Sequence, residues 1–171
     1  KYEEDIYQMI TKEYYKMAHY FQKIENRSKE SMFKLIRQIK LMIKATSIPH
    51  FFTEYKGDDL PNKYYKIFEL LDKLKDKKVA IGTTFIDAAD DYYKNIRSRF
   101  DRPVFLVKGD LSFAKRRQII NDFEKTKNGV LISTQQSMKS SINVPSCDDV
   151  IIESLQWNIP KISQFYFRFI R

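Results

Sequence analysis

The chain has 171 residues, of which 43% are hydrophobic, and a formal net charge of +9 from 31 basic and 22 acidic side chains. This length predicts one domain, or one domain with an appendage, and the apolar content suffices for a buried core. No apolar run approaches the roughly 20 residues of a membrane span, and one cysteine (Cys147) with two histidines excludes an intrachain disulfide and argues against a zinc site.

The first 60 residues predict two amphipathic helices. Apolar side chains recur at steps of three and four residues from Tyr2 to about Ile24, and again from Ser31 to about Lys44. The cluster Gly57-Asp58-Asp59-Leu60-Pro61 is typical of a turn and marks a boundary. We interpret residues 1–60 as a helical extension that packs in the ordinary way, or as a linker or brace from a preceding domain.

From residue 61 the pattern changes to alternating helices and short apolar strands. This alternation predicts an α/β fold, with a parallel sheet covered by helices on both faces. The expected elements are a helix from Asn62 to about Lys75, strand Val79–Ile81, a helix around residues 88–96, strand Val104–Val107, a helix from Ser112 through Phe123, strands Gly129–Ser133 and Val150–Ile152, and a final helix from about Pro160.

Small, hydroxyl-bearing or cationic residues follow three of these strands. Because ligands of open α/β sheets bind at the carboxyl ends of the strands, these residues are candidates for binding a nucleic-acid backbone. No strong general base is among them, which favours a phosphate-binding surface over a hydrolytic pocket. The candidates are Thr83 and Thr84, Lys108 and Gly109, and Ser133 and Thr134.

The final helix carries Gln164, Arg168 and Arg171 at spacings of four and three residues, which predicts one helical face. Guanidinium groups pair well with phosphate oxygens, so this face is a candidate phosphate-reading ridge. The charge distribution agrees with an anionic partner. Residues 1–60 hold 11 basic and 9 acidic side chains, whereas residues 61–171 hold 20 and 13.

The last third of the chain resembles motifs V and VI of superfamily 2 helicases, closest to the Swi/Snf-type ATPases. Gln164-Phe-Tyr-Phe-Arg168-Phe-Ile-Arg171 is similar to motif VI, although Phe167 fills a Gly/Asp position. Ser133-Thr134, followed after a spacer by Ser141-Ile142-Asn143-Val144, is similar to motif V, with Ser141 in place of a glycine. Val150-Ile-Ile-Glu153 and Trp157-Asn-Ile-Pro160 resemble the segment between the two motifs.

Earlier segments extend the resemblance over residues 62–171. Val79-Ala-Ile-Gly-Thr-Thr-Phe resembles motif IV, and Val107-Lys-Gly-Asp followed by Lys115-Arg-Arg-Gln118 and Phe123 resembles the pattern between motifs IV and V. The order and spacing of these pieces carry the resemblance. It implies that residues 61–171 form the second RecA-like (P-loop NTPase-type) lobe of an ATP-dependent DNA translocase or helicase.

The resemblance assigns roles to individual residues. Arg168 and Arg171 would act as catalytic arginine fingers, Gln164 would help to orient the nucleotide, and Asn143 would join the nucleic-acid-binding residues. ATP and Mg²⁺ would be held mainly by an N-terminal lobe of the same protein. The chain has no Walker A or Walker B motif, so we expect it to be a fragment that does not hydrolyse ATP by itself.

Two other interpretations stay open at the level of sequence. One is a non-catalytic nucleic-acid-binding or scaffold domain on a RecA-like fold, which would not need the paired arginines. The other is a flavodoxin-like regulatory domain, against which the Gln-Arg-Arg ridge argues. We expect duplex DNA as the nucleic acid, although the residues do not distinguish DNA from RNA. With no signal peptide in the sequence and a Lys-, Ile- and Tyr-rich composition, we expect a cytoplasmic protein of a bacterium or a phage-infected cell.

Overall fold

The computed structural model describes residues 1–23, 29–138, 143–144, 146–155 and 159–169. The chain divides into two compact units, Lys1–Lys63 and Tyr64–Arg171. Within the described residues, no helix combines the length and the apolar character needed to cross a membrane.

The first unit is a helical hairpin. It consists of α1 (Tyr2–Gln22), α2 (Lys29–Ser47) and the 3₁₀ helix η1 (Pro49–Phe51). Ile6, Ile10 and Ala45 are each at most 3% exposed and form its core. The buried amide of Gln38 donates from Nε2 to the main-chain oxygen of Ile10 at 3.0 Å, which joins the two helices. The predicted all-helical N-terminal segment is therefore confirmed.

The second unit is a parallel sheet with helices on both faces, as predicted. Its strands lie in the order β2-β3-β1-β4, and every pair is parallel. The register pairs Val79 with Val130 and Thr83 with Thr134. Its elements are α3 (Asn62–Lys73), β1 (Val79–Thr83), α4 (Ile86–Arg99), β2 (Val104–Val107), α5 (Phe113–Glu124), β3 (Val130–Thr134), β4 (Asp149–Ile152) and α6 (Ile159–Tyr166).

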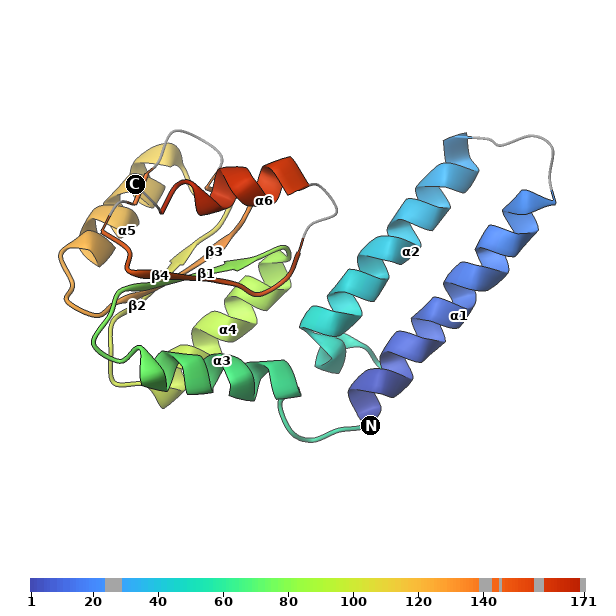
Figure 1. Ribbon diagram of the computed structural model, residues 1–171, viewed down its shortest axis with the longest axis horizontal. Coiled ribbons are helices and arrows are strands. Elements are labelled where there is room, and N and C mark those ends of the chain that lie inside the picture. Colours follow the sequence, from blue (N-terminus) through green and yellow to red (C-terminus); the bar gives the residue numbers. More distant parts are fainter. Residues whose placement is uncertain (24–28, 139–142, 145, 156–158, 170–171) are drawn as a thin grey trace. The chain divides into compact units, whose positions relative to one another are not determined.

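Each face of this sheet is covered by two helices. Figure 1 shows α3 and α4 on one face and α5 and α6 on the other. Ala80 and Leu131 share a buried cluster with Phe123 of α5 and Phe165 of α6. Because side chains alternate along a strand, the neighbours of Ala80 and Leu131 face α3 and α4. Both central strands, β1 and β3, are buried along their whole length, which explains their uninterrupted apolar runs.

Candidate nucleic-acid interface

A cleft of about 600 Å³ lies at the carboxyl ends of the strands, where the sequence predicted a ligand surface. Three predicted residues, Thr84, Gly109 and Thr134, line it. The first turn of α4 also borders the cleft, and the N-terminus of a helix favours anions. The other lining residues are Phe85, Ile86, Asp87, Arg116, Gln136 and Ser137.

Thr84 is held in place by the segment that follows β4. Its main-chain N–H donates to the Ser154 hydroxyl oxygen at 2.9 Å, and the Ser154 hydroxyl donates to Thr84 Oγ1 at 2.9 Å. Gln135 Nε2 donates to the main-chain oxygen of Ser154 at 2.6 Å. These bonds tie the ends of β1, β3 and β4 together, so the wall of the cleft is built before any ligand arrives.

The strand-end hydroxyls lie deeper than the sequence suggested. Thr83 and Ser133 are fully buried and do not line the cleft, and Thr134 is only 3% exposed. Thr134 Oγ1 accepts a hydrogen bond from the main-chain N–H of Ser137 at 3.3 Å, which shapes the turn after β3. The cause is strand length, because β1 and β3 each extend to these threonines and keep them inside the sheet.

Arg116 is a cleft residue that the sequence analysis did not single out. It comes from the first turns of α5, which Ser112 caps by accepting a hydrogen bond from the Lys115 N–H. Arg116 Nη1 donates to the main-chain oxygen of Ser137 at 2.8 Å, so the half-buried side chain is fixed across the cleft. A guanidinium held in this way is a strong candidate for a phosphate contact. The sequence signal that could have identified Arg116 is its position in Lys115-Arg-Arg-Gln118, the segment that resembles the helicase pattern between motifs IV and V.

Lys108 and Gly109 follow β2 and differ in their surroundings. The Lys108 ammonium lies 2.9 Å from Asp90 Oδ1 in a salt bridge to α4. The hydrogen bond to Asp90 raises the pKa of Lys108. Lys108 does not line the cleft, whereas Gly109 does, and a Cβ added at Gly109 would meet nothing within 4 Å.

The final helix is shorter than predicted. Helix α6 ends at Tyr166 and a turn covers residues 167–169, so Arg168 does not lie on the helix with Gln164. The last hydrogen bonds change from i→i−4 to i→i−3, as in the 3.1 Å bond from Arg168 N–H to the Phe165 oxygen. Phe165 and Phe169 are both 2% exposed, and their ring centroids lie 5.0 Å apart. The chain turns here because the turn buries both rings.

Arg168 contacts the segment expected to form motif V. Its Nη1 donates to Asn143 Oδ1 at 3.2 Å, and its main-chain oxygen accepts from the Val144 N–H at 2.8 Å. Gln164 is exposed on α6, and Asn143 is also exposed. The structure therefore brings Arg168 and Asn143 together. Arg171, Ser141, Ile142, Trp157 and Asn158, which were part of the sequence argument, lie outside the described residues.

Gly82 positions α6 against the sheet. A Cβ at Gly82 would lie 2.4 Å from Cε1 and Cζ of Phe165, so only glycine lets that ring rest on β1. Phe165 anchors the helix that presents Gln164 and leads into the Arg168 turn. A glycine within a buried strand was the sequence signal for such a close approach.

The sequence matches the helicase conserved C-terminal domain family over residues 62–171. No curated protein matches it. Among solved structures, the C-terminal part of the Fun30 ATPase domain is similar, with a TM-score of 0.76 at 16% identity over 100% of this chain and 77% of that one.

Two archaeal structures are also similar. The Sulfolobus solfataricus SWI2/SNF2 ATPase C-terminal domain has a TM-score of 0.71 at 17% identity, covering 88% of this chain and 66% of that one. The Sulfolobus solfataricus SWI2/SNF2 ATPase core in complex with dsDNA has a TM-score of 0.69 at 18% identity, covering 87% of this chain. The match spans only 32% of that ATPase core. At these identities the structures show a shared fold.

Proposed function

The chain belongs to the helicase conserved C-terminal domain family, and we propose that it is the second motor lobe of a Swi/Snf-type ATP-dependent DNA translocase. The family match and the shared RecA-like fold leave no reason to keep a flavodoxin-like regulatory domain as an alternative. The observation that carries the proposal is the cleft at the carboxyl edge of the sheet, with Arg116 fixed across it and Thr84 and Gly109 on its walls.

We propose that this cleft holds the phosphate backbone of a nucleic acid. Its polar groups include a guanidinium, hydroxyls, the Gln136 amide and a helix N-terminus, which suit phosphate oxygens, together with one carboxylate, that of Asp87, which does not. None of them is arranged to read a base edge, so binding should not depend on sequence. This suits a motor that tracks a backbone. We take duplex DNA as the ligand because the Sulfolobus ATPase core of the same fold is described in complex with dsDNA.

Substitution of Gly109 tests this proposal without disturbing the fold, because the space beyond its Cα is open. Gly109→Glu adds a negative charge to the cleft and should weaken duplex binding roughly 3- to 10-fold. Gly109→Gln, of nearly the same size and uncharged, should stay within about twofold of the wild type. Fluorescence anisotropy with two unrelated duplexes at several salt concentrations measures both effects. Equal affinities for the two variants would contradict the cleft as the binding site.

We further propose that Gln164, Arg168 and Arg171 act on ATP and Mg²⁺ held mainly by an N-terminal lobe of the same protein. The two described groups fit a nucleotide phosphate chemically, since Arg168 is a hydrogen-bonded guanidinium and Gln164 is an exposed amide. A guanidinium cannot act as a base, so its contribution would be electrostatic stabilisation of the phosphoryl group.

The arginine proposal needs a protein that contains both lobes. There, Arg168→Ala or Arg171→Ala should lower DNA-stimulated ATPase turnover about 10²-fold or more, and Arg168→Lys should not restore it fully. Asn143→Ala removes one hydrogen-bond partner of Arg168 and keeps the charge, and because Asn143 is itself a candidate nucleic-acid contact, its duplex affinity is measured beside its ATPase turnover. An Asn143→Ala variant that binds duplex normally but is as inactive as Arg168→Ala would give Arg168 only a structural role.

The alternative is a non-catalytic nucleic-acid-binding or scaffold domain. The Arg168–Asn143 hydrogen bond favours it to the extent that the arginine holds a loop in place. The ATPase assay of the two-lobed protein distinguishes the motor lobe from the scaffold. A scaffold domain would bind duplex DNA through the cleft, and replacement of both arginines would leave the ATPase activity unchanged.

A further inference from the structure

The hydroxyl of Thr84, on the wall of the cleft, is oriented by Ser154, which lies 70 residues further along the chain. A hydroxyl has one hydrogen to donate and can also accept, so its neighbours decide which role remains for a ligand. The Ser154 hydroxyl oxygen accepts the Thr84 main-chain N–H at 2.9 Å, and Ser154 donates its own hydrogen to Thr84 Oγ1 at 2.9 Å. Ser154 is only 5% exposed, which shields these bonds from water. The Thr84 oxygen therefore accepts inside the protein, and its hydrogen is left to donate.

Gln135 occupies the acceptor that would otherwise take the Thr84 hydrogen. In the part of the chain that the structure describes, the Thr84 hydroxyl reaches one acceptor, the main-chain oxygen of Ser154, at 3.5 Å. That distance is longer than a normal hydrogen bond between two oxygens. Gln135, which is 1% exposed, donates from Nε2 to the same oxygen at 2.6 Å. The Thr84 hydrogen is thus available to a better acceptor in the cleft.

We propose that Ser154 and Gln135 are positioning residues, which together make Thr84 a preset hydrogen-bond donor to an oxygen of the bound phosphate. This inference rests on the proposed function of the cleft as the backbone-binding site. Phosphate oxygens accept hydrogen bonds, so a hydroxyl with a free hydrogen suits them. A hydroxyl that accepts one hydrogen bond is also polarised to donate a stronger one. Ser154 and Gln135 do not line the cleft themselves, so each acts through Thr84.

A purely structural role of these two residues makes a different prediction. The same hydrogen bonds join the ends of β1, β3 and β4. In a structural role, their loss would distort the whole cleft and displace Arg116 as well as Thr84. In a positioning role, their loss would act on Thr84 alone. A double-mutant cycle and the salt dependence of binding separate the two cases.

Fluorescence anisotropy of the 171-residue chain with duplex DNA measures the cycle. Thr84→Val removes the donor and should weaken binding about tenfold, whereas Thr84→Ser keeps it and should stay within about twofold of the wild type. Ser154→Ala leaves the Thr84 hydroxyl unoriented and should weaken binding about threefold, and Gln135→Met should have the same effect. In the Thr84→Val background, Ser154→Ala should cause no further loss, because the hydrogen that Ser154 directs is gone.

The dependence of affinity on salt shows whether the cations of the cleft are disturbed. Thr84→Val and Ser154→Ala remove no charge, so the slope of log affinity against log salt should equal that of the wild type. Arg116→Gln removes a cation that lines the cleft and should lower the slope by about one. The melting temperature of each variant, from calorimetry, verifies that the second unit is folded.

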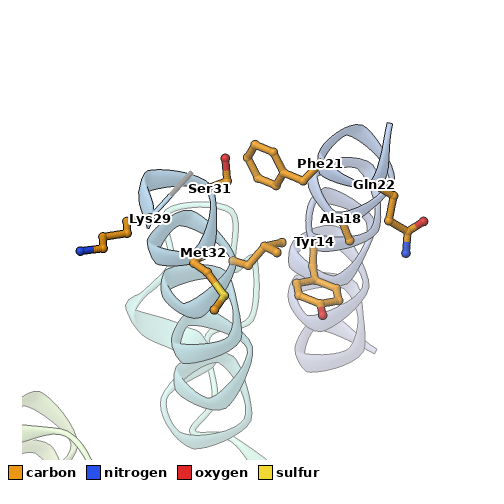
Figure 2. A pocket seen from close by; sticks show the side chains of 8 residues that line it. Tyr14, Ala18, Phe21, Gln22, Lys29, Ser31 and Met32 are labelled. Carbon is orange, nitrogen blue, oxygen red and sulfur yellow. The ribbon is translucent and has the colours of Figure 1, made fainter. Parts of the chain in front are cut away.

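Ser31→Ala is the matched control for the removal of a serine hydroxyl. Ser31 lines a second concave surface, of about 430 Å³, which lies between α1 and α2 and outside the family match at residues 62–171. Figure 2 shows Ser31 in the first turn of α2, across from Phe21 of α1. The duplex affinity of Ser31→Ala should equal that of the wild type.

The outcomes separate this inference from the proposed function. Wild-type duplex affinity in Ser154→Ala, while Gly109→Glu still binds more weakly than Gly109→Gln, would overturn the inference and keep the cleft as the binding site. A loss in Ser154→Ala that persists undiminished in the Thr84→Val background, or that comes with a lower salt slope, would give Ser154 only a structural role. Equal binding by the two Gly109 variants would overturn the proposed function of the cleft and this inference with it.

Discussion

The close approach of α6 to β1 at Gly82 leads to a quantitative prediction for stability. In Gly82→Ala the new Cβ would stand 2.4 Å from two Phe165 ring carbons, against the 3.4 Å at which ordinary contact begins, so the ring must move by about 1 Å. The ring is 2% exposed and packed against Phe169, so it cannot move into solvent. Overpacking of this size costs about 1–3 kcal/mol.

Differential scanning calorimetry measures this cost. For a unit of this size the melting temperature should fall by at least about 4 °C. The matched control is Gly109→Ala, because a Cβ there meets nothing within 4 Å and should leave the melting temperature nearly unchanged.

A double-mutant cycle with Phe165→Ala identifies the cause of the loss. Phe165→Ala alone should cost about 3–5 kcal/mol because it leaves a cavity. In that background Gly82→Ala should cost less than about 0.5 kcal/mol, since the clashing ring is gone, so the two changes should not be additive. Additive losses, or a Gly82→Ala variant as stable as Gly109→Ala, would refute the role assigned to Gly82.

Three further predictions follow from individual contacts. Arg102 donates from Nε to the main-chain oxygen of Asn128 at 2.6 Å and from Nη1 to that of Leu74 at 3.2 Å. Arg102→Ala should therefore lower the free energy of unfolding by about 1–3 kcal/mol in a urea titration, and an unchanged unfolding midpoint would contradict this prediction. Asp90→Asn removes the negative charge that pairs with Lys108, the residue before Gly109, so duplex affinity should rise about two- to tenfold in anisotropy through electrostatic attraction, whereas a fall would contradict this contribution of Lys108. Burial raises the pKa of the Cys147 thiol to about 11, so alkylation of the folded chain should be slow at pH 8 and accelerate towards pH 11, and rapid labelling at pH 8 would show that the thiol is accessible and ionised.

The sheet was predictable from sequence because its strands are local apolar runs. Val104–Val107 was predicted with its observed bounds, and Ser112 was recognised at the start of α5, where its side chain caps the helix. Parallel order follows from the alternation of strands and helices, which needs no knowledge of long-range contacts. Strand ends were less accurate, since Thr83 and Thr134 pair with each other inside the sheet and are not free at its edge.

The candidate site was only partly predictable because its details depend on contacts between distant residues. Arg116 enters the cleft through a bond to Ser137, 21 residues away, and Lys108 is paired with Asp90, 18 residues away. The end of α6 is set by the burial of Phe165 and Phe169, whereas helical spacing alone predicted a longer helix. The spacing of residues along the sequence predicts on which face of a helix or strand a side chain lies. It does not predict which distant residue that side chain contacts.

Hydrogen–deuterium exchange of the chain with and without saturating duplex DNA tests the central claim most directly. If the carboxyl-edge cleft holds the backbone, exchange should slow in residues 84–87, 109–116 and 134–137, which contribute its walls. Protection there, absent from α1 and α2, is the result we predict. Bound duplex that protects the hairpin helices and leaves the three cleft segments unchanged would contradict the assignment of this cleft as the DNA-binding surface.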